Sequence, residues 1–497
     1  MQNKPGNPLL YEINTRCWLR ELSEQNSARV TLADVPDSEF ERWRKLGFTH
    51  VWLMGVWTSG PRTRAYALAD AGLQRTCREV LTDFKPEDIG ASPYAVAEYE
   101  VPAALGGEAG LKHFRRKLHA HGLKLLLDYV PNHVGLDHSW LIERPDLFVQ
   151  NATEVPGTFQ QNTGRGPRWL AHGKDPNFPP WGDTVQLDYR RAVTRTAMKE
   201  ALLSIAKRCD GVRCDMAMLL LDDVFATTWA QYPPVEEPPA SEFWADAISA
   251  AKTAHPGFLF LAEAYWGLET RLQSLGFDFT YDKELYDALV QRDGAGVQKH
   301  LLDAIPEFVR AGAHFLENHD ERRIASVLPS AEHCVAALLV SSLPGMCLLH
   351  DGQLTGSRIK SPVQLLRRPV EPHDEDIAAG YEHLLAILQH TAVGRGSGEL
   401  LKPRQAWPGN PTAQNFVIVQ WQKQPPEFDL AVVNLAPDRS QCFASLTVEK
   451  PGDYNWSMKD LLGTEEYERS GDDLQAQGLY LDLPEYGAQL FHFSPKI

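Results

Sequence analysis

Side chains that could perform acid–base or nucleophilic chemistry gather at four places in the sequence, each at the end of an apolar run. The four groups are Asp128 with His133, Arg213 with Asp215, Glu263 alone, and His319 with Asp320. Two carboxyl groups held close together can divide the roles of nucleophile and proton donor between them. Buried charges cost stability unless they are paired. The recurrence of these charged side chains at the ends of apolar runs therefore indicates a functional site.

Eight apolar runs supply the elements that must position these residues. Near-continuous apolar runs are typical of parallel strands that are buried on both faces. Helical patterns lie between the runs, as in the stripe of Leu111, Phe114 and Leu118. The sequence therefore predicts an α/β fold, a parallel (β/α)8 barrel with its functional residues at the carboxyl ends of the strands. The predicted strands are 10–13, 50–54, 124–130, 211–215, 258–263, 277–279, 314–318 and 346–350.

Two stretches interrupt the alternation of strands and helices. Residues 135–188 are rich in Pro, Gly and Trp and are too long for an ordinary connection, which predicts an inserted loop domain after the third strand. Residues 399–497 contain short alternating segments separated by turn residues, which predicts a C-terminal antiparallel β-sandwich domain. The catalytic barrel is then expected to comprise residues 1–134 and 189–398.

Composition limits the class of partner. Lys and Arg total 49 and Asp and Glu total 65, and the net charge of −16 disfavours binding to nucleic acid or to an anionic membrane. The polar N-terminal residues lack the apolar core of a signal peptide, and no apolar run reaches the roughly 20 residues of a membrane span. The seven cysteines are scattered and form no Cys-x-x-Cys pair. We expect a cytoplasmic protein with reduced thiols, and the sequence leaves its oligomeric state open.

Four segments resemble, in order and spacing, the four motifs of the α-amylase superfamily of retaining α-glucoside hydrolases and transglycosylases. They are Asp128–His133, Gly211–Asp215, Ala262–Ala264 and Glu317–Asp320, on the predicted strands three, four, five and seven. Tyr94, in the segment Ser92-Pro93-Tyr94, matches the superfamily tyrosine that stacks on the sugar at the cleavage site. The resemblance extends to the insertion and to the C-terminal β-domain.

The resemblance implies a role for each matched residue. Asp215 matches the nucleophile, Glu263 the acid/base, and Asp320 the third carboxylate, which grips sugar hydroxyls. The substrate-binding set would be Tyr94, Asp128, His133, Arg213 and His319. Arg213 lies two residues before Asp215 on the same face of the strand, so its charge should orient that carboxyl group and hold its pKa down. Retaining enzymes place their two catalytic carboxyl groups about 5–5.5 Å apart.

Two departures from the superfamily pattern bear on cofactor and substrate. Many members bind calcium through the asparagine that matches Asn132 and an aspartate in the insertion, but Gln186 stands where that aspartate is expected. Because calcium affinity follows ligand charge, we expect no calcium and no other cofactor. Starch-cleaving members often carry Lys-His where this chain has Met218 and Leu219, so short carbohydrates are favoured over long glucans.

Each residue also has a structural alternative. Arg213 and Asp215 could form a buried ion pair, Glu263 could cap a helix, and the histidines could be satisfied core residues. Arg358, Arg367 and Arg368 are either salt-bridged or, if they face the site, ligands for a phosphorylated or carboxylated sugar. Four tryptophans in candidate loops could stack on sugars, namely Trp57, Trp140, Trp181 and Trp266.

The hypothesis that follows is an enzyme, a retaining α-glycoside hydrolase acting on short α-glucosides or malto-oligosaccharides through a covalent glucosyl–Asp215 intermediate. A transglycosylase or a disaccharide isomerase would use the same residues. A non-catalytic family member would only bind carbohydrate, and a metal-dependent hydrolase would need histidines at ligand spacing. The only His-x-His pair, His119 and His121, lies at the end of a predicted helix.

Overall fold

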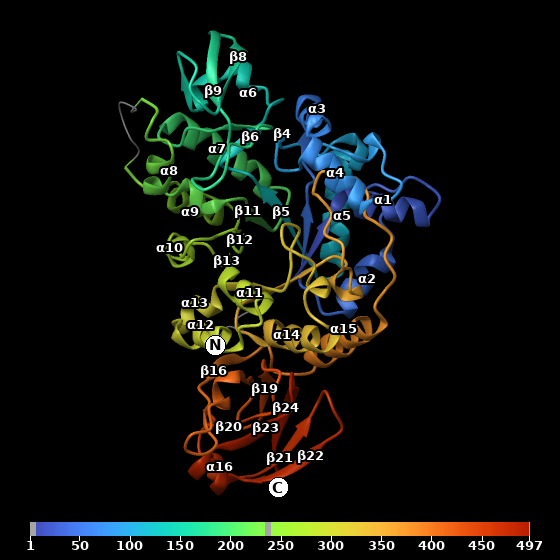
Figure 1. The fold of residues 1–497 in the computed structure, drawn as a ribbon, viewed down its shortest axis with the longest axis vertical. Helices are drawn as coiled ribbons and strands as arrows, with labels where there is room; N and C mark the ends of the chain where they lie inside the picture. Colours follow the sequence, from blue (N-terminus) through green and yellow to red (C-terminus); the bar gives the residue numbers. More distant parts are fainter. Residues whose placement is uncertain (1–5, 234–239, 497) are drawn as a thin grey trace.

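The computed structural model describes residues 6–233 and 240–496. Eight parallel strands close into a barrel in the order β1-β15-β14-β13-β12-β11-β5-β2 (Figure 1). Their bounds are β1 Leu9–Asn14, β2 His50–Met54, β5 Lys124–Tyr129, β11 Gly211–Cys214, β12 Leu259–Ala262, β13 Phe279–Tyr281, β14 Gly312–Phe315 and β15 Met346–His350. The predicted barrel is confirmed.

Two barrel strands differ from their predicted positions. The sixth strand is Phe279–Tyr281 rather than 277–279, because Phe277 packs against Trp244 of a covering helix and Thr280 pairs with the next strand. The seventh is Gly312–Phe315 rather than 314–318. Only three or four residues of each strand pair with a neighbouring strand. The apolar run begins before the paired residues in the sixth strand and extends beyond them in the seventh.

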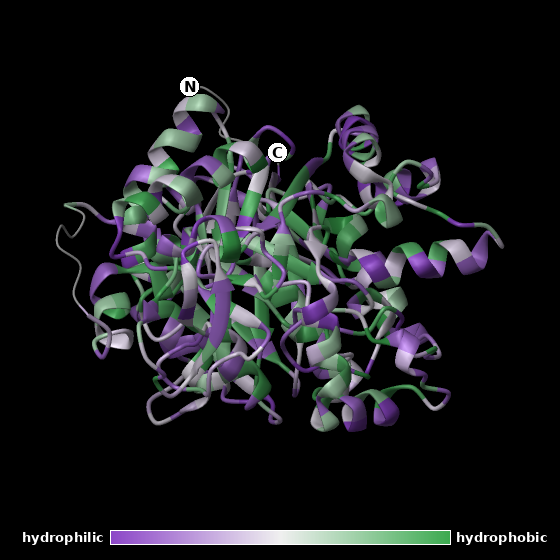
Figure 2. Cartoon of the chain, turned by 90° about the horizontal axis from the view of Figure 1, so that it is seen from above, coloured by the Kyte–Doolittle hydropathy of each residue, from purple (hydrophilic) through white to green (hydrophobic). Residues whose placement is uncertain are grey.

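Helices surround the barrel and bury their apolar faces against it, and hydrophobic residues concentrate toward the centre of the molecule (Figure 2). The longer ones include the predicted helices around 111–118, 201–206, 243–254 and 332–340. The helices that cover the barrel include α1 Thr15–Gln25, α2 Asp37–Lys45, α5 Gly107–Ala120, α7 Ala192–Ala206, α8 Asp222–Thr228, α9 Phe243–Ala254, α10 Glu269–Ser274, α11 Lys283–Val290, α12 Gly294–Asp303, α13 Pro306–Arg310, α14 Ser330–Ser342 and α15 Glu375–Leu388.

The connection between β2 and β5 contains elements that were not predicted from the sequence. It contains α3 (Pro61–Ala69) and α4 (Ala71–Val80), and a short antiparallel pair formed by β3 (Thr58–Ser59) and β4 (Val96–Glu98). Tyr94 lies just before β4. A second region of chain therefore rises above the same end of the barrel as the insertion.

The segment after β5 leaves the barrel through an antiparallel stem. In this stem β6 (His133–Gly135) pairs with β10 (Thr184–Gln186), and the register places Gln186 opposite His133. Beyond the stem lie α6 (Trp140–Glu143) and a three-stranded sheet of β7 (Gln150–Asn151), β9 (Gly166–Ala171) and β8 (Thr158–Thr163). This sheet stands at the top of the molecule in Figure 1.

The C-terminal region is an antiparallel β-domain, as predicted, and packs below the opposite end of the barrel (Figure 1). Trp421 is buried at this junction and donates from Nε1 to the carbonyl oxygen of Ser342 at 2.7 Å. One sheet contains β16 Ser397–Leu401, β18 Phe416–Gln422, β19 Phe428–Asn434, β24 Ala488–Lys496, β21 Asn455–Asp460 and β22 Glu466–Ser470; the other contains β17 Arg404–Gln405, β20 Ser440–Ala444 and β23 Leu479–Leu483, with α16 Gly471–Gln477 alongside.

The seven cysteines all lie in the described part of the chain and carry free thiols. Within residues 6–233 and 240–496, we find no helix with the length and apolar character needed to cross a lipid bilayer.

Candidate active site

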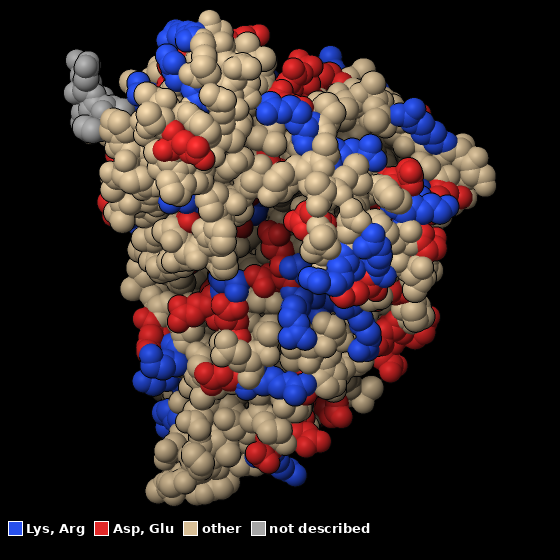
Figure 3. All heavy atoms as spheres, turned by 45° about the horizontal axis from the view of Figure 1, so that its top comes forward, with Lys and Arg blue, Asp and Glu red and all other residues tan. Residues whose placement is uncertain are grey.

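The four motif segments meet at the carboxyl ends of the barrel strands. The register sets Arg213 beside Asp128 on one neighbouring strand and beside Leu261 on the other, so Asp215 and Glu263 both follow directly above this layer. Charged side chains of both signs line a recess in this face of the molecule (Figure 3). The barrel topology therefore brings together residues that are up to about two hundred positions apart in the sequence, as expected for this type of barrel.

Arg213 forms an ion pair with each of the two candidate catalytic carboxylates. Its Nη1 lies 2.7 Å from Oδ1 of Asp215 and its Nη2 lies 2.7 Å from Oε2 of Glu263. The guanidinium group is completely buried, and the side chains of both acids are less than a tenth exposed. One planar cation thus fixes the position of both carboxylates.

Aromatic rings enclose this guanidinium group. Its central carbon lies 5.2 Å from the ring centre of Tyr94, 5.3 Å from that of Trp52 and 5.8 Å from that of Tyr281. Cation–π attraction stabilises a buried arginine in such a cage, and the cage leaves it little freedom to rotate.

The expectation that Arg213 would hold the pKa of Asp215 down is wrong in its net effect. Burial and the charge of Glu263 together raise the pKa of the Asp215 carboxyl group to about 7, although Arg213 opposes both effects. A carboxyl group removed from water and placed beside a second acid is harder to ionise. Arg213 therefore orients Asp215 without fully offsetting its burial.

Glu263 is held by two hydrogen bonds in addition to its ion pair with Arg213. Tyr265 donates from its hydroxyl group to Oε1 at 2.8 Å, and the backbone N–H of Met216 donates to Oε2 at 2.7 Å. Met216 has a φ of +45°, in the left-handed region that residues with a side chain rarely adopt. Backbone strain at the residue after Asp215 accompanies the hydrogen bond that places Glu263.

Asp128 is buried at the end of β5. Its Oδ1 accepts from Nε1 of Trp52 at 3.2 Å and its Oδ2 accepts from the backbone N–H of Gly55 at 3.0 Å. Burial raises the pKa of its carboxyl group to about 6. Both carboxyl oxygens already have partners from the chain around β2, so Asp128 fixes that region of the rim.

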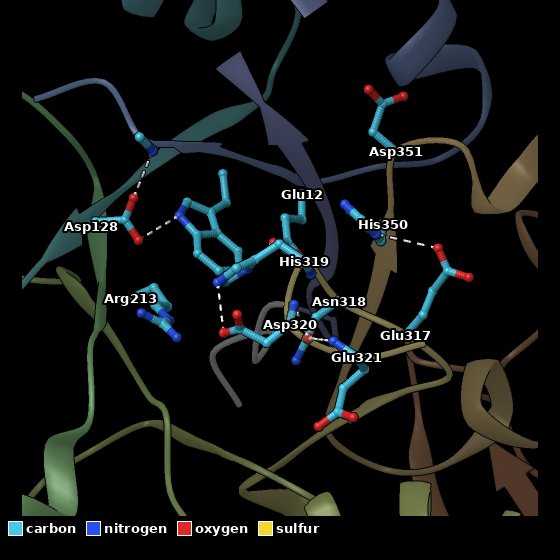
Figure 4. Close-up of polar contacts among 12 residues, drawn as sticks. Glu12, Asp128, Arg213, Glu317, Asn318, His319, Asp320, Glu321, His350 and Asp351 are labelled. Carbon is cyan, nitrogen blue, oxygen red and sulfur yellow. Dashed lines mark hydrogen bonds and ion pairs between the residues drawn. The ribbon is translucent and has the colours of Figure 1, made fainter. Parts of the chain in front are cut away.

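His319 stands between the carboxylates of Glu12 and Asp320 (Figure 4) and also contacts Tyr94. Its Nδ1 lies 2.5 Å from Oε1 of Glu12, and its Nε2 lies 2.9 Å from Oδ2 of Asp320 and 2.8 Å from Oη of Tyr94. The rings of His319 and Tyr94 are stacked with centres 5.2 Å apart. The side chain of Asp320 remains 49% exposed, so this carboxylate is accessible from the recess.

The position at which many superfamily members bind calcium is occupied by paired amides. Nε2 of Gln186 donates to Oδ1 of Asn132 at 3.0 Å and to the carbonyl oxygens of Asn132 and Leu187 at 2.8 and 3.0 Å. Calcium requires several oxygen ligands directed at one point. Here the side-chain N–H groups of Gln186 already donate to the oxygens of Asn132 and Leu187, and Gln186 supplies no carboxylate.

Comparison with known proteins agrees with this geometry. A family model described as the catalytic domain of α-amylase matches residues 39–364, about two thirds of the chain. The chain belongs to the α-amylase family. The match places it among glycoside hydrolases and transglycosylases.

Individual relatives of this α-amylase family chain are distant. "Alpha-amylase MalA" of Haloarcula japonica is 27% identical over 363 residues, which span 70% of this chain but only 44% of that protein. "Alpha-amylase 3" of Dictyoglomus thermophilum is 20% identical over 418 residues, 78% of this chain and 72% of that protein. The crystal structure of an α-amylase from Lactobacillus plantarum matches with a TM-score of 0.67 at 21% identity over 98% of this chain and 99% of that chain, which shows a shared fold.

Several other residues singled out in the sequence make structural contacts in this α-amylase family chain. Met218 and Leu219 are buried in the core behind the rim. Arg358 pairs with Asp374, Arg367 with Asp83 and Asp88, and Arg368 with Glu21 and Asp351, so these arginines are salt-bridged. His119 bonds to Asp210 at the start of β11, at the far end of the barrel.

The candidate tryptophans occupy different environments. Trp57 is buried and donates to the carbonyl oxygen of Asp128 at 2.7 Å, which is a structural contact. Trp140 packs on His138, and Trp181 packs on His133 with ring centres 5.1 Å apart. Trp266 is 45% exposed and follows Glu263 by three residues. Trp266 is therefore the most exposed of the four.

Sequence reasoning missed Glu12, which the structure places directly against His319. A signal was present, since Glu12 is a charged residue inside the apolar run Leu10–Ile13. A charged residue in a fully buried strand requires a partner, and that requirement could have drawn attention to it.

Proposed function

We propose that the chain is a retaining α-glycoside hydrolase that acts on short α-glucosides or malto-oligosaccharides. The observation that carries the proposal is the contact of one buried guanidinium group, that of Arg213, with Asp215 and Glu263 at 2.7 Å each. Two carboxylates fixed on one cation at the floor of a recess can serve as nucleophile and acid/base.

The proposed reaction has two displacements. The Asp215 carboxylate attacks the anomeric carbon while the glycosidic C–O bond breaks and the proton of Glu263 passes to the leaving oxygen. Glu263 then takes a proton from water, whose oxygen attacks the same carbon and releases Asp215. Tyr94, His133, His319 and Asp320 would hold the sugar ring, with Asp320 accepting from its hydroxyl groups.

Short substrates are favoured because the two positions at which starch-cleaving members often carry Lys-His hold apolar residues in this chain. The two residues that replace Lys-His, Met218 and Leu219, contribute to the core rather than to the recess. The geometry at Asn132 and Gln186 further supports an enzyme that works without calcium. Action in the cytoplasm is part of the same proposal, which rests on composition.

The test is the product formed by the purified chain from 4-nitrophenyl α-glucoside and from maltose through maltoheptaose, with amylose for comparison. Proton NMR of the first product should show the α-anomer, and a β-anomer would refute a retaining mechanism. Faster release from maltotriose than from amylose is expected, and the reverse would refute the preference for short chains. Predominant transfer to an added sugar acceptor would instead identify a transglycosylase.

A further inference from the structure

Glu12 and His319 form a buried pair that the proposed chemistry has not used. Glu12 lies on β1 with its side chain fully buried, and both of its contacts with hydrogen-bond donors are to His319. The Nδ1 of the imidazole lies 2.5 Å from Oε1, and the backbone N–H of His319 lies 3.4 Å from the same oxygen. The other oxygen, Oε2, has no hydrogen-bond partner among the described residues.

The opposite side of the imidazole faces acceptors in the recess. Nε2 lies 2.9 Å from Oδ2 of Asp320, and Figure 4 shows His319 between Glu12 and Asp320. An imidazole with a carboxylate on each nitrogen satisfies both only when both nitrogens carry a proton. The buried pair therefore connects the barrel interior to a carboxylate that is open to substrate.

We infer that Glu12 is a positioning residue that keeps His319 as a doubly protonated imidazolium, so that Nε2 remains a charged donor to Asp320 or to a sugar hydroxyl group that takes its place. The inference rests on the proposed function of the recess. Hydrogen bonds from a charged donor are shorter and stronger than those from a neutral one. Loss of the Glu12 charge would then weaken the hydrogen bonding of His319 to the sugar, although every group that contacts the sugar would remain in place.

Other charges face His319 from the surrounding elements and must be included. They are the carboxylates of Asp320 on the same loop and of Asp128 at the end of β5. The uncharged hydroxyl group of Tyr94 contacts Nε2, and the guanidinium group of Arg213 acts on Asp320. Burial by itself lowers the pKa of His319, but the carboxylates of Asp320 and Glu12 outweigh it and raise that pKa to about 10. Asp320 lies in the open recess, where a sugar competes for it, whereas Glu12 is shielded from solvent. Glu12 is therefore the partner that persists when substrate binds.

The first measurement is nitrogen-15 NMR of the full chain labelled at histidine, with His319 assigned from the signal lost in His319→Gln. At pH 8 the parent should show both ring nitrogens protonated. Glu12→Gln should lower the pKa of His319 by about two to three units, within the usual effect of removing one adjacent charge, so that at least half of the rings are neutral at pH 8. Glu12→Asp keeps the charge and should retain the imidazolium signature.

The second measurement is kinetic and uses α-glucosyl fluoride, because fluoride departs without a proton from Glu263. At pH 8, Glu12→Gln should lower kcat by roughly tenfold or more with a smaller change in KM. The reason is that the hydrogen bonds to the sugar are stronger in the transition state than in the ground state. The ratio of variant to parent kcat should rise as the pH is lowered to 6, because His319 regains its proton. A ratio that does not change with pH would overturn the inference.

Asp429→Asn provides a matched control. Asp429 is a buried carboxylate in the C-terminal domain and lies 2.8 Å from Nδ1 of His492. Its replacement should leave both the His319 signature and the kcat ratio unchanged.

The two proposals can fail separately. A parent enzyme that does not release fluoride contradicts the proposed function, whereas a neutral His319 ring in the parent at pH 8 contradicts the role of Glu12. A neutral His319 ring at pH 8 in the parent or in Glu12→Asp would overturn the inference even if Glu12→Gln does not fold.

Discussion

The Nη2 atom of Arg213 lies 2.7 Å from Oε2 of Glu263, although the two residues come from neighbouring strands and are fifty positions apart in the sequence. The same guanidinium group holds Asp215 through its other terminal nitrogen. Removing one member of a buried ion pair leaves an uncompensated charge. The three residues must therefore be treated as one unit when variants are interpreted.

Asp215→Asn should reduce turnover of 4-nitrophenyl α-glucoside by about a thousandfold or more, because the variant lacks the nucleophile. Asp210→Asn is the matched control, since Asp210 precedes the same strand at the opposite end of the barrel and bonds to Arg115. That variant should keep activity and lose stability. Steady-state release of nitrophenol and thermal unfolding check both expectations. Activity retained in Asp215→Asn would mean that another residue is the nucleophile.

The pH dependence of kcat/KM should show a decline as the pH falls below about 7. Asp215 must be ionised to attack, and burial raises the pKa of its carboxyl group to about 7. The pKa of Asp215 is therefore higher in the folded protein than in the unfolded chain. The folded protein loses stability as the pH rises from the unfolded-chain pKa toward 7, because Asp215 must then be ionised in a buried position. The melting temperature of Asp215→Asn relative to the parent should therefore be higher at pH 8 than at pH 5. A difference of the opposite sign would contradict this environment for Asp215.

Glu263→Gln should slow poor leaving groups far more than good ones. The missing proton matters most when the departing oxygen is strongly basic, and general acid catalysis contributes roughly 100- to 10,000-fold. The measurement is kcat/KM for maltose, 4-nitrophenyl α-glucoside and α-glucosyl fluoride, with each substrate serving as the internal control for the others. Equal slowing of all three would exclude an acid role for Glu263.

Chelation of calcium should not alter the stability of the parent chain. Gln186 directs an N–H donor at the oxygens of Asn132 and Leu187, where a cation would need ligands. Differential scanning calorimetry with EDTA and with added calcium should give one melting temperature. Gln186→Asp restores a carboxylate and should make stability depend on calcium. A drop of several degrees on adding EDTA to the parent would show that calcium is bound after all.

The sequence by itself determined the barrel. Strands buried on both faces appear in it as continuous apolar runs, and the covering helices appear as apolar residues at helical spacing. It also determined which residues gather at the rim, since parallel strands bring their carboxyl ends to one face. The first and last residues of short strands were predicted less well, as the shift of the sixth strand to Phe279–Tyr281 shows. The reason is that an apolar residue next to a strand can pack against the covering helices instead of pairing in the barrel. The two helices between β2 and Tyr94, α3 and α4, were not predicted, because no pattern in their residues was strong enough to indicate them.

Only the tertiary structure decided the electrostatics of the site. The spacing of Arg213 and Asp215 suggested a lowered pKa, but the extent of burial and the approach of Glu263 from the next strand reverse the direction. The contact of Glu12 with His319 joins positions more than three hundred residues apart, and no local pattern encodes it. Periodicity specifies which residues are buried, whereas the charge that each one carries depends on neighbours that the closed barrel brings together.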